Sequence, residues 1–171
     1  MLPAAHQSYL KKEQVSMGWM NLIMNGFFAW LIFKALKSIP LWGLQDSIAF
    51  DLSITGFLLG FLVCLGVSFG SRKKISAHNL KTLSIKSLGL AGRLPQSLFA
   101  RSLIIGFLGL GMSWITIAGV ALAGASSLSL YAYIILKAIA ACIYALICNH
   151  FTVIRAFADA EHAASIQVEK A

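Results

Sequence analysis

Four long apolar runs constrain this chain more than any other feature. They cover about residues 15–33, 47–70, 103–125 and 130–151. A helix needs about 20 apolar residues to cross the hydrocarbon core of a bilayer, and each run is close to that length or longer. The chain is 58% hydrophobic and 12% charged, whereas soluble domains carry about 25% charged residues. The sequence therefore predicts one all-α domain, residues 1–171, that forms an integral membrane bundle of four transmembrane helices.

The first run could also be the core of a signal peptide, because Lys11 and Lys12 precede it. It is longer than a typical signal core, and no cleavage pattern of small residues follows it. We therefore expect a retained helix. Pro40 makes a continuous helix across the first two runs unfavourable. The short polar segment 124–127 indicates a tight hairpin between the last two runs.

Basic residues are concentrated between the second and third runs. Cytoplasmic loops carry an excess of Lys and Arg, so the loop 71–102, the N-terminus and the tail 152–171 are expected in the cytoplasm. The loop's charge and its alternating apolar residues suggest a short interfacial helix on anionic lipid. Orientation and lipid headgroups account for this charge, so nucleic acid is not expected as a partner. The loop contains no acid, and its basic residues are Arg72, Lys73, Lys74, Lys81, Lys86, Arg93 and Arg101.

Two charged residues lie inside the apolar runs. Asp51 is about four residues from the outer edge of the second run, roughly 6 Å, and Lys137 is about seven residues inside the fourth, roughly 10 Å. Because a lysine stem can reach several ångströms, these depths are compatible with an Asp51–Lys137 contact. The contact could be structural, fixing the helix register, or it could be a proton or substrate site. A third alternative is that Lys137 extends to the interface alone.

Small and polar residues mark one face of each run. Asn21 and Asn25 share a face of the first run, and Thr55 lies one turn from Asp51 in the second. Such residues either hydrogen-bond between helices or line a polar path along the bundle. Gly56 and Gly60 form a GxxxG pair roughly opposite Asp51. This pair suits close helix packing, either inside the bundle or in a homo-oligomer.

The sequence contains no catalytic signature. We find no P-loop, no HExxH zinc motif and no GxSxG nucleophile elbow. The three cysteines lie in apolar runs without a CxxC pair, which predicts neither a disulfide framework nor quinone-linked thiol chemistry. We expect no metal and no cofactor, and an enzyme is the least supported class.

Three short strings resemble a known group of proteins: Asn25-Gly26-x-x-Ala29-Trp30, Pro40-Leu41-Trp42-Gly43 and Ser47-Ile48-Ala49-x-Asp51-Leu52. Leu136-Lys137-Ala138 in the fourth run adds to the likeness. The chain resembles small bacterial inner-membrane proteins with four spans, loosely described as permeases. The resemblance implies a bacterial plasma membrane and draws attention to Asp51 and Lys137. It implies no substrate.

Two functions remain open at this point. The first is a small permease acting as an oligomer, with Asp51 and Lys137 as its titratable centre and Asn21, Asn25 and Thr55 along the route. The second is a non-transporting accessory, scaffold or regulatory subunit that binds a membrane protein partner. We expect the basic loop to contact anionic lipid at the cytoplasmic face, and in the second function it would bind either lipid or a cytoplasmic partner.

Overall fold

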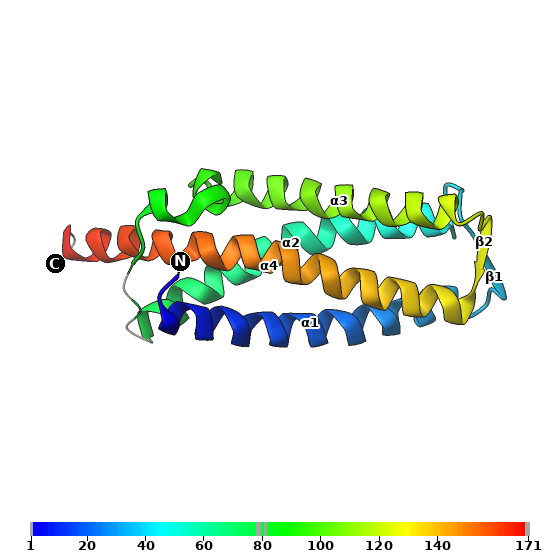
Figure 1. Ribbon diagram of the computed structural model, residues 1–171, viewed down its shortest axis with the longest axis horizontal. Coiled ribbons are helices and arrows are strands. Elements are labelled where there is room, and N and C mark those ends of the chain that lie inside the picture. Colours follow the sequence, from blue (N-terminus) through cyan, green and yellow to red (C-terminus); the bar gives the residue numbers. More distant parts are fainter. Residues whose placement is uncertain (1, 78–79, 81, 170–171) are drawn as a thin grey trace.

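Four long helices dominate the fold. The computed structural model describes the backbone of residues 2–77, 80 and 82–169, and the side chains in these ranges except at 72–77, 86 and 160–169. Each long helix is long and apolar enough to cross a membrane, which confirms the predicted all-α membrane bundle (Figure 1). The helices are α1 (Ala4–Phe33), α2 (Ile48–Ala77), α3 (Leu98–Leu122) and α4 (Leu130–Glu169).

Local sequence signals set several of the helix ends. The Ser47 hydroxyl accepts a hydrogen bond from the Phe50 amide at 3.3 Å, and so caps the start of α2. Ser129 does the same for α4, accepting from the Ala132 amide at 3.4 Å. Gly124 has a φ of 77° just beyond the end of α3, a conformation that favours glycine and terminates helices.

α2 and α4 form the centre of the bundle, and α1 and α3 lie on opposite sides of them (Figure 1). α1 packs mainly on α4, where Gly18 approaches Leu146 and Gly26 approaches Ala138. α3 packs mainly on α2. Because α1 packs far more on α4 than on α2, a groove remains between α1 and α2.

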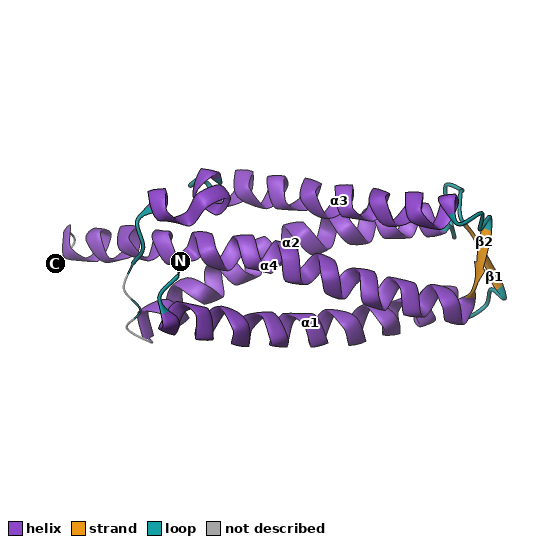
Figure 2. Cartoon of the chain, viewed as in Figure 1, coloured by secondary structure: helices purple, strands orange, loops and turns teal. Residues whose placement is uncertain are grey.

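A short antiparallel ribbon joins the two connections at one end of the bundle. β1 (Ser38–Pro40) pairs with β2 (Ser127–Ser129) (Figure 2), and Ile39 lies opposite Leu128 in this pair. From the sequence we expected only turns at these two connections. We call this the ribbon end, and the opposite end, where α1 begins and α4 ends, the terminal end.

The helices at the terminal end are longer than the predicted spans. α1 begins at Ala4, and α4 runs through the predicted tail as one helix. Val153 and Phe157 in that tail are buried, and the ring of Phe157 meets the His6 ring edge-on at 4.7 Å. The tail therefore extends the fourth helix, and α1 and α4 continue to bury apolar side chains beyond the fourth predicted span.

The predicted loop 71–102 is shorter than expected and packs partly on protein. α2 extends to Ala77, α3 begins at Leu98, and the 3-10 helix η1 (Ile85–Arg93) lies between them. Leu88 and Ala91 are buried, and the Leu83 amide donates to the Phe157 carbonyl at 3.2 Å. The loop's short helix is present, but two of its apolar side chains cover the protein core instead of facing lipid.

Candidate functional site

Asp51 and Lys137 meet between α2 and α4. The Lys137 ammonium donates to Asp51 Oδ2 at 2.6 Å, and the Tyr133 hydroxyl donates to the same oxygen. Tyr133 and Lys137 are four residues apart in α4, so both side chains leave the same face of that helix. The contact expected from the depths of the two charges is present, and Tyr133 adds a second donor. We call these three residues the Asp51 clamp.

The Asp51 clamp is almost closed to its surroundings. The side chains of Lys137 and Asp51 are 3% and 15% exposed, and Tyr133 is fully buried against Phe33, with ring centroids 5.2 Å apart. One carboxylate faces one ammonium and one hydroxyl, so the charges cancel locally. A buried pair of this kind fixes how two helices sit against each other, and removing one partner leaves an uncompensated charge.

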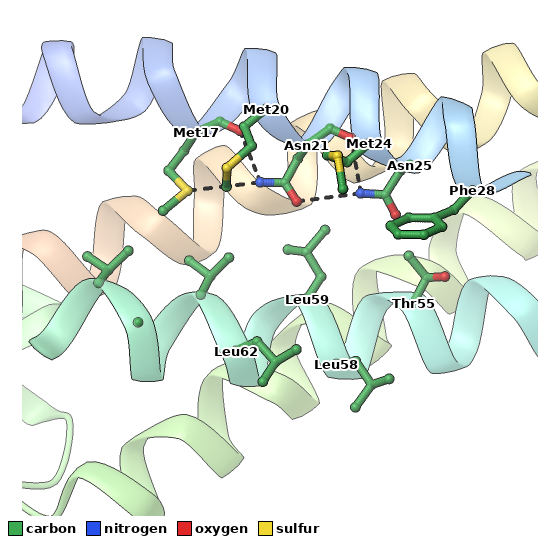
Figure 3. A pocket seen from close by; sticks show the side chains of 13 residues that line it. Met17, Met20, Asn21, Met24, Asn25, Phe28, Thr55, Leu58, Leu59 and Leu62 are labelled. Atoms are coloured by element: carbon green, nitrogen blue, oxygen red, sulfur yellow. Dashed lines mark hydrogen bonds between the residues drawn. The ribbon is translucent and has the colours of Figure 1, made fainter. Parts of the chain in front are cut away.

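Asn21, Asn25 and Thr55 lie in a different place from the Asp51 clamp. They line a groove of about 540 Å³ between α1 and α2, together with mostly apolar side chains (Figure 3). The described residues that line this groove include neither Asp51 nor Lys137. The structure therefore does not bring all five predicted polar residues into one site.

The groove has an adaptable apolar wall with a polar centre. Met17, Met20 and Met24 project from α1 toward Leu59 and Leu62 of α2 (Figure 3). Methionine side chains are flexible and polarisable, and they are common on surfaces that accept varied partners. Met20 and Met24 are 51% and 45% exposed, so the groove opens to the surface of the bundle.

The two asparagines at the centre of the groove are partly satisfied by their own helix. The Asn21 amide donates to the Met17 carbonyl at 3.0 Å, and the Asn25 amide donates to the Asn21 carbonyl at 3.0 Å. The Asn25 amide also lies 3.5 Å from Asn21 Oδ1. No hydrogen bond to Asn25 Oδ1 occurs within the part of the chain that the structure describes. A hydrogen-bond acceptor thus remains available in the groove.

Gly56 and Gly60 serve packing inside the chain. A methyl group on Gly56 would stand 2.5 Å from the Gly109 carbonyl oxygen, and one on Gly60 would collide with the Ile105 carbonyl. The backbones of α2 and α3 therefore touch directly. Of the two alternatives for this GxxxG pair, the structure favours the contact within the bundle.

The assignment of Arg101 to the lipid-facing basic loop is wrong. Arg101 lies in α3 with 0% of its surface exposed, and its Nη1 donates to Asp159 Oδ2 at 2.7 Å. Counting Lys and Arg residues in loops predicts the side of the membrane on which an arginine lies, but it does not predict which carboxylate the arginine pairs with. Asp159 lay in the predicted tail, where the spacing of Arg155 and Asp159 at four residues was the only available signal.

The other predicted basic residues are described only in part. Arg93 is exposed at the end of η1. Arg72, Lys73, Lys74 and Lys86 lie within helices, but their side chains, and Lys81 entirely, fall outside the described residues. Contact between this loop and lipid therefore stays a prediction.

Among the residues that the structure describes, no cluster of three or more His, Cys, Asp or Glu side chains could hold a metal ion. Another interhelical polar contact joins Thr116 and Tyr144, whose hydroxyl oxygens are 2.5 Å apart. This contact joins α3 to α4 and serves packing.

Comparison of this chain with protein-family models, curated proteins and solved structures gives no match. The resemblance to small bacterial four-span membrane proteins therefore stays a prediction, and function has to be argued from the geometry.

Proposed function

We propose that this chain is a non-transporting accessory protein of a membrane, and that the α1–α2 groove binds one transmembrane helix of another membrane protein. One observation carries the proposal. The groove opens to the side of the bundle and holds the polar groups of Asn21, Asn25 and Thr55 among apolar walls. A helix with an apolar surface and one hydrogen-bonding side chain would match both features.

The depth of the asparagines favours a helix over a lipid chain. Asn25 and Asn21 lie 8 and 12 residues from the end of α1 at Phe33, which is about 12 to 18 Å along the helix. The middle of a bilayer core is about 15 Å from either edge. Hydrocarbon chains at that depth cannot donate a hydrogen bond to Asn25 Oδ1, whereas a Ser, Thr, Asn or Gln on a partner helix can.

The shape of the groove favours a different protein over a second copy. A two-fold contact places the same surface of both copies against each other. Two concave grooves placed face to face would enclose a gap rather than fill one, and tight interfaces have few gaps. A single convex helix fills the groove instead.

The alternative, a small permease centred on Asp51, would need a hydrated path to that carboxylate. Asp51 is instead bonded to Lys137 and Tyr133, and the groove lining contains neither Asp51 nor Lys137. This geometry supports an architectural role for the pair and favours the accessory function.

The proposal includes a location and an orientation. The resemblance to bacterial inner-membrane proteins supports the bacterial plasma membrane. The excess of Lys and Arg between the second and third spans supports a cytoplasmic terminal end, with anionic lipid near the exposed Arg93. A membrane-impermeant thiol reagent should label Arg93→Cys, in a chain whose three native cysteines have been replaced, only after the cells have been broken open. Labelling in intact cells would contradict this orientation.

Photo-crosslinking in native membranes tests the groove. In one variant a photoreactive amino acid replaces Met24 in the groove. In the control variant it replaces Ile115, which lies on α3 and is 73% exposed. We expect one adduct of discrete mass from position 24 and none of that mass from position 115. Mass spectrometry should identify a transmembrane segment with a hydrogen-bonding residue at the attachment site.

Two matched glycine substitutions complete the test. Gly66 lines the groove, and Gly111 lies on α3; neither would bring a Cβ within 4 Å of its surroundings. Gly66→Leu should fill the groove and abolish the adduct, whereas Gly111→Leu should leave it unchanged. An adduct of twice the 18.5 kDa chain mass, adducts with lipid alone, or persistence of the adduct in Gly66→Leu would each overturn the proposal.

A further inference from the structure

A second polar cluster lies at the terminal end, away from the groove and the Asp51 clamp. Arg101 of α3 and Arg155 of α4 both approach Asp159, at 2.7 and 3.1 Å. Arg155 Nε also donates to the Leu94 carbonyl at 3.2 Å. All three charged side chains are more than nine-tenths buried. We call Arg101, Arg155 and Asp159 the arginine cluster.

One edge of the Arg101 guanidinium has no hydrogen-bond partner among the residues that the structure describes. Its Nη1 is bonded to Asp159, but Nε and Nη2 are fully buried and make no hydrogen bond among the described residues. Nε and Nη2 carry parallel N–H bonds on the same edge of the guanidinium. This is the geometry with which arginine binds two oxygens of a carboxylate or phosphate at once.

The described charges around this edge do not cancel. The arginine cluster contains two guanidinium groups and one carboxylate, so its described side chains carry one excess positive charge. Burying an uncompensated charge is costly. A water molecule could accept from the open edge but would leave the charge in place. An oxyanion would satisfy both the donors and the charge.

The depth of the cluster suits a phosphate at the membrane surface. Arg101 is the fourth residue of α3, a helix of 25 residues. Such a helix is about 37 Å long at 1.5 Å per residue, and the hydrocarbon core is about 30 Å thick. The first turn of α3 therefore falls near the level of lipid headgroups. Basic pockets between transmembrane helices bind phosphate headgroups at this level.

We infer that the open edge of Arg101 binds a phosphate-type oxyanion within the arginine cluster. Asp159 competes with this ligand for Arg101 and Arg155, and therefore weakens its binding. This site differs from the exposed charge of the loop because it depends on a bidentate geometry that lysine does not provide. It is independent of the proposed groove partner.

Thermal unfolding of the purified full chain in detergent, followed by tryptophan fluorescence, tests this site. The probes are phosphatidylglycerol in the micelles, phosphatidylcholine at the same fraction, and inorganic phosphate against chloride at equal ionic strength. We expect a saturable rise in the unfolding midpoint with phosphatidylglycerol or with phosphate, but not with phosphatidylcholine or chloride. The active probe identifies the source of the oxyanion as a lipid headgroup or a free ion.

Three variants separate the site from general charge effects. Arg101→Lys keeps the positive charge but cannot donate two parallel hydrogen bonds. It should raise the probe concentration needed for half-saturation about tenfold, as expected for losing a charge-assisted hydrogen bond. Arg93→Lys, exposed at the same end, should behave like the wild type. Asp159→Asn should lower the ligand-free midpoint but strengthen oxyanion binding, because it removes the competing carboxylate.

Arg101→Lys should weaken oxyanion binding, whereas Asp159→Asn should strengthen it. A cluster with a purely structural role would not show these opposite effects on binding. The inference is overturned if neither probe raises the midpoint of the wild-type chain in a saturable way. It is also overturned if Arg101→Lys binds the active probe as tightly as the wild type does. The titration of the wild-type chain with each probe tests oxyanion binding even if a variant does not fold.

Discussion

The direct backbone contact between α2 and α3 makes Gly56→Ala a sharp test of the packing. A Cβ on Gly56 would lie 2.5 Å from the Gly109 carbonyl oxygen and would also collide with the Ser113 hydroxyl. Ordinary carbon–oxygen contacts are about 3.3–3.6 Å, so the helices must move apart by about 1 Å. Overpacking of this kind costs about 1–3 kcal/mol.

Gly66→Ala is the matched control on the same helix. No atom lies within 4 Å of the Cβ that it would add, so its main effect is the gain in helix propensity, up to about 1 kcal/mol. Gly56→Ala gains the same propensity but loses the close contact. The two free energies of unfolding should therefore differ by about 1–3 kcal/mol, with Gly56→Ala the less stable.

Denaturant titration in mixed micelles, followed by tryptophan fluorescence, measures this difference. The variants should be compared in the same detergent and at the same protein-to-detergent ratio, because both affect apparent stability. Equal free energies of unfolding for Gly56→Ala and Gly66→Ala would refute the packing described for α2 and α3. A dimer that dissociates only in Gly56→Ala would instead place this glycine pair in an oligomer interface.

Further predictions concern the polar groups. Lys137→Met alone should destabilise the chain by about 3–5 kcal/mol, because it leaves the Asp51 carboxylate without its cation; adding Asp51→Leu should recover most of that loss in the same denaturant titration. Tyr133→Phe should cost about 1–3 kcal/mol by removing one donor to a buried carboxylate. Asn25→Leu should leave the unfolding midpoint of the isolated chain unchanged or raised while lowering the groove adduct from position 24. Arg101→Ala should lower the thermal midpoint by more than about 5 °C, because it empties the space of a fully buried side chain and removes a hydrogen bond to Asp159.

The membrane fold was predictable because it depends on quantities that a sequence displays directly. Span length and hydropathy identify four helices, and the depth of Asp51 and Lys137 along their helices brings the two charges to the same level. The structure adds Tyr133 at that level. This partner could have been anticipated from its position four residues before Lys137 on the same helix face.

The groove and the arginine cluster were less predictable because they depend on how helices rotate and which ones pair. The sequence places Asn21 and Asn25 on one face of their helix, but it does not reveal that α1 packs on α4 and leaves a groove beside α2. Arg101 lies in the basic stretch 71–102, which was predicted to contact anionic lipid. Its partner, Asp159, is 58 residues away along the chain and came into reach because α4 continues past the expected membrane boundary.

A structure determined from native membranes, in nanodiscs that retain the surrounding lipid and protein, would show what occupies the α1–α2 groove. We expect a helix of another protein there, with a hydrogen-bonding side chain beside Asn25, and a dry contact between Asp51 and Lys137. A groove filled only by acyl chains, or a water-filled path that reaches the Asp51 carboxylate, would contradict this expectation.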